Sequence, residues 1–314
     1  MKIIYLDHNT QQTTPCVATI GFFDGVHRGH QFIIKNMVQQ AHQAGMEATV
    51  ISFSQHPQQV LQPNRSPMLL TTIEEKLSLL QQTGVDNVII LNFTPQIAAL
   101  SAQLFMENIL SKQLQVKQLL IGYDNRFGSR QEDTFKDYVR YGKALGIKVA
   151  QSCEFIETIL DTPISSSAIR KLLIKGDVSL AHQCLGYPYT LTAHVINGVK
   201  EGRKIGFPTA NLSINELNKL IPAKGVYAVK AQIDAEETWY QGMTCISNRP
   251  TFNGTSLSIE TNILDNFHQN IYGCKLSVAF YKRLRSEQKF NTINDLCAQI
   301  EVDKRNVKQF FSKK

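Results

Sequence analysis

Cysteine is sparse in this 314-residue sequence, and its spacing is unsuited to zinc binding or thiol redox chemistry. The six cysteines lie far apart, with no CxxC pair and no histidine spaced to complete a zinc site. Several of them stand in apolar stretches, so we interpret them as buried free thiols and not as a redox centre. This spacing argues against a zinc protein and a CxxC redox protein, and it fits a reducing compartment.

Long hydrophobic runs are also missing. No window reaches the ~18 apolar residues of a membrane span, and the opening residues, MKIIYLDHNT, lack the apolar core of a signal peptide. We therefore expect a cytoplasmic protein with no membrane partner. The sequence has no linker rich in Pro, Gly and Ser, no repeats and no low-complexity segments, which predicts closely joined domains.

The length exceeds the size at which one hydrophobic core usually stops growing, so two domains are expected. Hydrophobic residues make up 43% of the chain, which is enough to build these cores without disulfides or metals. The formal net charge of +7 favours nucleic acid, an anionic membrane or nucleotide polyphosphates as partners. Because the basic residues are scattered, a solvated basic surface without a binding role explains the charge equally well.

The first half alternates short apolar runs with amphipathic stretches. Strands are predicted at 17–23, 47–53, 87–93, 118–124 and 147–152, and helices at 30–45, 72–84 and 98–113. This alternation is typical of a doubly wound parallel sheet that binds ligands at the carboxyl ends of its strands. Residues 165–186 are predicted to form one or two further helices.

The pattern changes after residue 186. Alternating segments at 189–196, 225–233, 238–246, 256–264 and 275–284 are separated by turns rich in Gly, Asn and Pro, and a last helix is predicted at 292–311. We therefore predict an α/β + β chain. A doubly wound, Rossmann-like domain spans residues 1–185, and a small antiparallel β-barrel with a terminal helix spans 186–314.

The string GFFDGVHRGH, residues 21–30, is the first candidate site. Gly25 and Gly29 permit tight turns and the close approach of a ligand, and the N–H groups of the following helix N-terminus can bind an anion. His27 and His30 flank Gly29, so both imidazoles can donate to one phosphate group. A GxG after a strand would be a weak signal, whereas HxGH at a strand–helix junction is specific.

The stretch VINGVKEGRKIGFPTANL, residues 195–212, is the second candidate site. It is not a Walker loop, because no GK[ST] follows at the required spacing. Its glycine-marked turns can nevertheless wrap a polyphosphate with backbone N–H groups. Thr209 and Asn211 present a hydroxyl and a carbonyl to the same side of an extended segment, and such hard oxygen donors suit Mg²⁺.

These strings resemble a known family. HxGH resembles the nucleotidyltransferase superfamily, and the whole first string resembles the FAD synthetase module of bacterial bifunctional riboflavin kinase/FAD synthetases. Three more segments resemble that module in order, namely SFSQHPQQVL (52–61), IGYDNRFGSR (121–130) and ISSSAIRKLLIKGD (164–177). Residues 186–314 resemble riboflavin kinase through GFPTAN (206–211), GVYAV (225–229), SNRPTF (247–252), IETNILD (259–265), IYG (271–273) and RLRSEQKF (283–290).

The resemblance implies a multifunctional transferase of FMN and FAD biosynthesis, a flavoprotein that uses ATP as co-substrate with Mg²⁺ at both sites. Riboflavin would be phosphorylated to FMN, and the FMN phosphate would then attack the α-phosphorus of ATP to give FAD and pyrophosphate. Catalysis would rest on positioning and on neutralising charge. The implied partners are riboflavin, FMN, FAD and ATP, without nucleic acid.

The resemblance also implies residue roles. His27, His30 and Arg170 would act on phosphates in adenylyl transfer, and Glu260 would accept the proton of the riboflavin 5′-hydroxyl. Asp124, Arg126 and Phe127 would belong to the flavin or nucleotide pocket, and Thr209 and Asn211 would hold the metal. Phosphate or nucleotide binding would involve Gly21, Phe23, Asp24, Gly25, Gly29, Ser165, Ser166, Ser167, Gly198, Gly202, Arg203 and Gly206.

The residues alone leave alternatives open. Asp124 fits a strand-end cap, Glu260 fits a solvated strand residue, and Arg283 and Arg285 fit either a flavin site or a charged surface. The chain also departs from the family pattern, which often has Asn at Phe22, Phe at Asn125 and Thr at Ser167.

Two other functions are therefore compatible with the sequence. One keeps only the kinase, with a degenerate first domain. The other is a basic nucleotide-binding regulator that binds RNA with a steep salt dependence. The lack of an RNP-like aromatic motif and of a basic tract argues against RNA binding.

Overall fold

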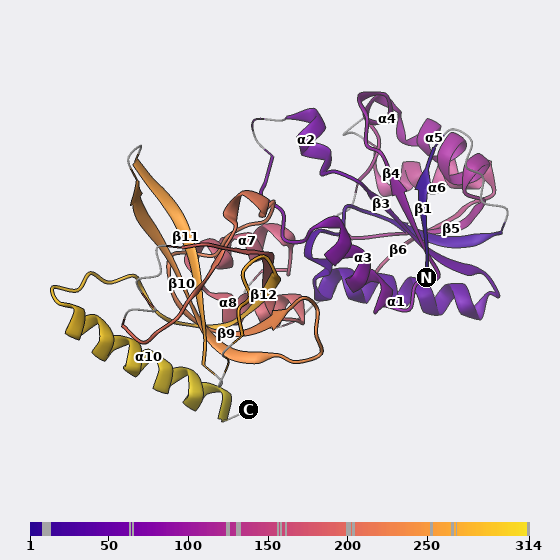
Figure 1. Cartoon of the computed structure of the whole chain (residues 1–314). Helices are drawn as coiled ribbons and strands as arrows, with labels where there is room; N and C mark the ends of the chain where they lie inside the picture. The colour runs from indigo at the N-terminus through magenta and orange to yellow at the C-terminus, as the bar shows by residue number, and fades with distance from the viewer. Residues whose placement is uncertain are drawn as a thin grey trace. The chain divides into compact units, whose positions relative to one another are not determined.

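The computed structural model describes residues 1–7, 14–62, 64, 66–123, 126–129, 133–155, 157, 159–160, 162–198, 202, 205–251, 254–264, 267 and 269–312, without the side chains of 249–251 and 254–256. The chain divides by its contacts into two compact units, Met1–Ser165 and Ser166–Lys314 (Figure 1). Contacts group residues 166–185 with the second unit because its two helices pack on each other and on a barrel strand. The functional boundary predicted at residue 185 stays a prediction.

The first unit is built on a six-stranded sheet in which all neighbouring strands are parallel, as predicted. The sequence pattern missed one edge strand, β1. The order places β3 and β4 on one side of β2 and β5 and β6 on the other, so the carboxyl ends of β2 and β5 flank the topological switch point where ligands bind in such sheets. From edge to edge the strands are β1 (Lys2–Leu6), β4 (Asn87–Leu91), β3 (Glu47–Phe53), β2 (Cys16–Ile20), β5 (Val116–Ile121) and β6 (Lys148–Gln151).

Helices pack on both faces of this sheet within the described residues. One buried cluster contains Ile34, Met37 and Leu80 with alternate strand residues, and a second contains Phe105 and Tyr138 with the other set. The central strands β2, β3 and β4 are therefore buried on both faces, which explains their nearly continuous apolar runs. The helices are α1 (Arg28–Gln43), α2 (Pro57–Leu61), α3 (Ile73–Gln81), α4 (Pro95–Ala99), α5 (Ala102–Phe105), the π-helix η3 (Met106–Gln113) and α6 (Phe135–Leu145).

The prediction of one continuous helix at 98–113 was wrong, because the chain breaks at Leu100. Leu100 is extended, with ψ 132°, and ends α4. Ser101 then caps α5, because its hydroxyl accepts a hydrogen bond from the Leu104 N–H at 3.3 Å. Local capping by serine thus competes with helix continuation, a choice that apolar spacing does not reveal.

The second unit is a closed six-stranded barrel whose strand pairs are antiparallel, again as predicted. Along β7, Tyr189, Leu191, Ala193 and Val195 are buried and fill the interior. The three-residue strand β8 was missed, because it is too short to show alternation. Around the barrel the strands are β10 (Tyr240–Thr251), β11 (Gly254–Ile263), β8 (Ala210–Leu212), β7 (Tyr189–Ile196), β12 (Lys275–Arg285) and β9 (Gly225–Ile233).

Residues 165–186, predicted to form one or two helices, form two, α7 (Ser166–Lys175) and α8 (Val178–Leu185), which precede the barrel. They are separated at Gly176, which has a left-handed φ of 83°, and Asp177 caps α8. Helix α10 (Ile293–Ser312) ends the chain. Its buried Asp303 accepts hydrogen bonds from Arg285 at the end of β12, the shortest at 2.8 Å.

We expect Asp303→Ala to destabilise the barrel unit by about 3–5 kcal/mol, because it leaves the Arg285 charge partly buried without its partner. Urea unfolding followed by fluorescence isolates this unit, since Trp239 is the only tryptophan of the chain. Glu301→Ala on the same helix is the control, because its pair with Lys304 is exposed and is worth at most about 1 kcal/mol. Equal effects of the two substitutions would contradict the role of the buried pair.

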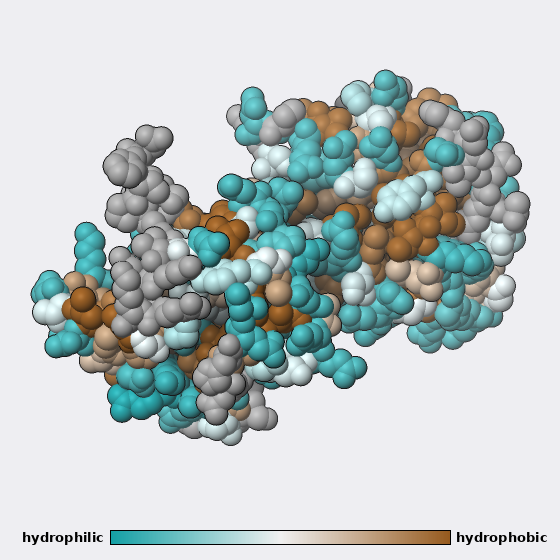
Figure 2. Space-filling model, in the orientation of Figure 1, coloured by the Kyte–Doolittle hydropathy of each residue, from teal (hydrophilic) through white to brown (hydrophobic). Residues whose placement is uncertain are grey.

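On the face that Figure 2 shows, hydrophilic side chains surround several groups of apolar ones. Within the described ranges, no helix combines the length and apolar character needed to cross a membrane.

Candidate active sites

The HxGH turn follows β2 directly. The predicted strand 17–23 ends at Ile20, and a short 3-10 turn, η1 (Asp24–Val26), leads into α1. The strand stops early because the chain enters left-handed conformations, with φ 54° at Phe23 and 76° at Gly25. Such a φ costs a non-glycine residue roughly 1–2 kcal/mol, so neighbouring contacts must hold Phe23 in this position.

Asp24 supplies some of the contacts that stabilise the turn containing Phe23. Asp24 is 3% exposed, and its carboxylate accepts hydrogen bonds from the N–H groups of Leu70 and Thr71 at 3.0 and 3.2 Å. The Thr71 hydroxyl donates to it at 3.2 Å and accepts from the Gly25 N–H at 3.1 Å. The turn is therefore fastened to the segment before α3.

The two histidines of the motif lie together. Their rings stack with centroids 3.6 Å apart, and His27 Nδ1 accepts the His30 backbone N–H at 3.4 Å as the N-cap of α1. Burial lowers the pKa of His30 well below its usual value, and the nearby charges of His27 and Lys76 lower it further. His30 is therefore a neutral imidazole at neutral pH.

The Nδ1 atom of His30 is buried and meets no hydrogen-bond partner among the residues that the structure describes. Buried polar atoms are nearly always paired in folded proteins, so this one points to a polar ligand. Gly29 allows the close stacking, because a Cβ there would lie 3.3 Å from the His27 ring, and at Gly21 a Cβ would meet the Phe23 ring at 3.0 Å.

The SSSAIR segment follows Ile164, whose carbonyl lies 3.7 Å from where a Gly29 Cβ would be. The chain entering this segment therefore lies beside the HxGH turn within the first unit. Ser165 is half-buried just before α7. Ser166, Ser167 and Arg170 belong to the first five residues of α7 in the second unit, where Ser167 is exposed and Arg170 half-buried.

The predicted flavin or nucleotide pocket is described only in part, since Asp124 and Asn125 lie outside the described residues. Arg126 is exposed, and Phe127 is half-buried and stacks on Tyr138 with centroids 4.6 Å apart. The Tyr138 hydroxyl bonds both the N–H and the carbonyl of Phe127, at 3.3 and 3.1 Å. Sequence reasoning missed Tyr138, because its place on helix α6, 11 residues after Phe127, gives no local signal.

In the barrel, Glu260 of β11 pairs in register with Asn211 of β8. Thr209 donates a hydrogen bond to Glu260 Oε2 at 3.0 Å, and Ser258 donates to Oε1 at 3.1 Å. Side chains alternate along β11, so Ser258, Glu260 and Asn262 share the outer face of the barrel. Asn262 holds the preceding turn through the Pro208 carbonyl at 2.6 Å.

The glycine-rich loop packs back on this cluster. A Cβ on Gly198 would collide with the Asn211 amide, and one on Gly202 would collide with the Phe207 carbonyl. Gly206 has a left-handed φ of 86°. The predicted residue Arg203 lies outside the described residues. Glycine is thus required at two close contacts and at one turn.

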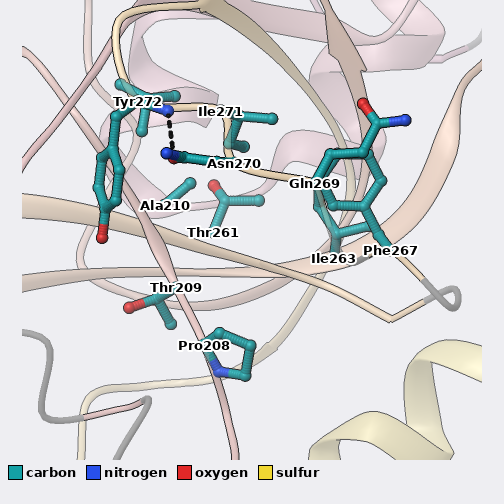
Figure 3. A pocket seen from close by; sticks show the side chains of 11 residues that line it. Pro208, Thr209, Ala210, Thr261, Ile263, Phe267, Gln269, Asn270, Ile271 and Tyr272 are labelled. Atoms are coloured by element: carbon teal, nitrogen blue, oxygen red, sulfur yellow. Dashed lines mark hydrogen bonds between the residues drawn. The ribbon is translucent and has the colours of Figure 1, made fainter.

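A pocket of about 80 Å³ opens on the inner side of the same strands. Figure 3 shows Tyr272 and Phe267 at opposite ends of it, with Thr261 and Ala210 between them. The Tyr272 N–H donates to the Asn270 side chain at 3.2 Å and orders this wall. Thr209 lines the pocket and also bonds Glu260, so it connects the pocket to the carboxylate. The remaining lining residues are Val195, Pro208, Ile263, Gln269 and Ile271.

The two arginines left open by the sequence have structural partners. Arg285 pairs with Asp303, as described above. Arg283 donates to the carbonyls of Lys175 and Lys224, at 3.4 and 2.5 Å. Both side chains fasten the barrel to neighbouring segments. All six cysteines are free. The expectation of burial is confirmed for Cys16 and Cys184 and fails for the exposed Cys153, and the other three cysteines are half-buried.

A parallel sheet with HxGH at its switch point, and a barrel with a carboxylate beside a glycine-rich turn, define an ATP-dependent transferase of the phosphoryl and nucleotidyl class. Residues 9–168 match the family model described as FAD synthetase, and residues 185–311 match riboflavin kinase. The chain belongs to the bifunctional riboflavin kinase/FMN adenylyltransferase family.

Relatives match over the full length. Bifunctional riboflavin kinase/FMN adenylyltransferases are 40% identical in Listeria monocytogenes (100% of this chain, 99% of that protein) and 37% in Bacillus subtilis (99% of each). The Escherichia coli enzyme is 36% identical over 99% of this chain and 98% of its own. A solved Streptococcus pneumoniae structure, described as a macrolide-efflux protein, is similar with a TM-score of 0.87 and 28% identity, covering 98% of this chain and 99% of that one.

Proposed function

We propose that this protein makes FAD from riboflavin in two ATP-consuming steps, one in each unit. The barrel unit transfers the γ-phosphoryl group of ATP to riboflavin and forms FMN. The sheet unit transfers the adenylyl group of a second ATP to FMN and releases pyrophosphate. The observation that carries the proposal is the presence of two separate polar constellations, His27 with His30 and Thr209 with Glu260, each inside its own unit.

In the kinase step, Glu260 accepts the proton of the riboflavin 5′-hydroxyl as that oxygen attacks the γ-phosphorus. Hydrogen bonds from Thr209 and Ser258 to its two oxygens fix the direction of the carboxylate. Gly198, Gly202 and Gly206 let the loop approach the phosphates with its backbone N–H groups. Arg203 belongs to the same proposal.

The donor set beside Glu260 fits Mg²⁺. Thr209 gives its proton to Glu260, which leaves the lone pairs of its hydroxyl oxygen for a cation, and Asn211 offers an amide oxygen on the paired strand. Mg²⁺ prefers such hard oxygens and takes few protein ligands besides substrate phosphates. When bound, it would neutralise charge on the phosphates; Thr209 and Asn211 would hold it.

The pocket beside Thr209 suits the adenine base of ATP. It has apolar walls, from Val195 to Ile271, and an aromatic ring at each end. An apolar slot with a few polar edges is the usual site for a flat heterocycle.

In the adenylyl transfer step, no covalent intermediate is needed, so positioning and charge neutralisation do the catalytic work. Neutral His30, with His27 stacked on it, donates hydrogen bonds to the phosphates. Ser165, Ser166, Ser167 and Arg170 bind the departing pyrophosphate. Asp124, Arg126 and Phe127 contribute to the flavin or nucleotide pocket. The free cysteines fit a reducing environment, and we place the enzyme in the cytoplasm.

Labelled ATP tests both steps in one protein. With riboflavin as substrate, γ-³²P-ATP should label FMN, whereas α-³²P-ATP should label FAD and leave FMN unlabelled. Label from α-³²P-ATP in FMN, or no label in either flavin, would contradict the proposed chemistry.

A further inference from the structure

Lys76 of α3 is a buried lysine near the first site that the sequence did not single out. Only 3% of it is exposed, although lysine is rarely buried unless it is paired. Its ammonium donates to three uncharged oxygens, at 3.2 Å to the Phe22 carbonyl, 3.1 Å to the Phe53 carbonyl and 3.2 Å to the Ser52 hydroxyl. These bonds tie the chain after β2 to the end of β3.

Phe22 completes a cage around this ammonium. Its ring centroid lies 4.1 Å from Nζ, a distance that gives a cation–π attraction. The ring also packs edge-on against His56, with centroids 4.7 Å apart, and the Phe22 carbonyl accepts a second bond from the Ser52 hydroxyl at 3.1 Å. The aromatic residue at position 22 therefore has a structural partner in this chain, namely Lys76.

The cage adjoins the HxGH turn. Helix α3 packs against η1, and the Lys76 charge acts on His30. The turn with the left-handed Phe23 is thus fastened at two places. Asp24 binds it to the segment before α3, and Lys76 binds Phe22, the residue before Phe23, to β3.

We propose that Lys76 is a positioning residue for adenylyl transfer, whose positive charge locks the turn after β2 so that His27 and His30 meet the phosphates. This inference rests on the proposed function of the first unit. Lys76 acts through the Phe22 carbonyl and the turn. Its charge also favours a polyphosphate nearby, because the oxygens that accept its protons carry no negative charge.

The proposal predicts a pH dependence. Burial lowers the pKa of Lys76 to about 8, and the charge of Asp24 opposes this shift. The charged or titratable groups facing Lys76 and its cage are Asp24 on η1, His30 on α1 and His56 beside Phe22. His30 is already neutral in this range. As the pH rises through about 8, Lys76 loses its proton in the folded protein, and its hydrogen bonds and cation–π contact with the turn weaken.

Stability changes in the opposite direction. In the unfolded chain the pKa of Lys76 has its ordinary value of 10.5, so the unfolded state binds more protons between pH about 8 and 10.5. The contribution of Lys76 to the free energy of unfolding therefore rises with pH over that window. The titration of Lys76 therefore does not itself unfold the protein, and unfolding measured over the same pH window separates a loss of activity from a loss of fold.

The experiment compares pH profiles of kcat/KM for FMN adenylylation and riboflavin phosphorylation, each with its own flavin supplied to the full chain. We expect adenylylation to fall above pH about 8, approaching about tenfold per pH unit, without a matching limb in phosphorylation. Lys76→Met should lower adenylylation on the order of 10- to 100-fold at pH 7 and remove the alkaline limb. Lys35→Met, which removes an exposed lysine from α1, should leave both profiles unchanged.

A wild-type profile that is flat from pH 7 to 9.5 would overturn the proposal, and so would a Lys76→Met enzyme that keeps the alkaline limb. The wild-type profile needs no variant, so poor folding of Lys76→Met does not remove the test. Absence of any FAD formation by the wild type would instead contradict the proposed function of the first unit.

Discussion

His30→Ala is expected to reduce the rate of FAD formation from supplied FMN by at least about 10²-fold. Removing one preorganised hydrogen-bond donor to a charged transition state typically lowers the rate of an enzyme by this factor. His30 is half-buried, neutral and stacked on His27, and the alanine leaves no ring to donate to the phosphates. FMN formation from riboflavin should be retained, because that reaction takes place in the other unit. Chromatography of flavin products with each substrate supplied separately measures both.

His42→Ala is the matched control for this substitution. It removes the same side chain from the same helix, at an exposed position paired with Asp86 at 2.9 Å, and both activities should stay near wild type. Loss of both activities by His30→Ala in a folded protein would contradict independent sites.

Glu260→Gln should have the opposite effect, with FMN formation reduced about 10²- to 10⁴-fold and FAD formation from supplied FMN retained. Glutamine keeps the size of the side chain and can still accept from Thr209, but it cannot take up the proton of the 5′-hydroxyl. Asn211→Ala should act in the same direction by removing an oxygen donor. Initial rates at saturating ATP, with riboflavin as the varied substrate, measure the loss.

Glu237→Gln on the same unit removes an exposed carboxylate and should leave FMN formation unchanged. If Glu260→Gln kept the wild-type rate, Glu260 would not be the base, and its bonds to Thr209 and Ser258 would only stabilise the barrel.

Much of this architecture follows from local patterns. The βα alternation of the first half and the short alternating segments of the second predict the parallel sheet and the closed barrel, and both predictions are confirmed. The strand ends are less predictable. Apolar residues continue to Phe23, yet β2 stops at Ile20, because the turn that presents His27 needs left-handed backbone there.

The candidate sites also contain residues that the sequence predicts and residues that it does not. The HxGH and GFPTAN strings reveal the residues that carry phosphate chemistry, because their glycines and polar groups are contiguous. Lys76, Tyr138 and Ser258 are not evident from the sequence. Lys76 reaches Phe22 from a helix 54 positions away in the chain, and Tyr138 binds Phe127 from 11 positions away. Ser258 was missed although it binds Glu260 from only two positions away on the same strand. Helical spacing alone would place Lys76 on a solvated face.

The most direct test of the two-step account is a time course of flavin products. The purified chain is incubated with riboflavin, ATP and Mg²⁺, and in parallel with FMN, and the products are separated by chromatography. The account predicts that riboflavin passes through FMN to FAD and that supplied FMN also gives FAD, which would make Phe22 and Asn125 tolerated variation. FMN that accumulates without FAD in both incubations would contradict it and leave the kinase alone.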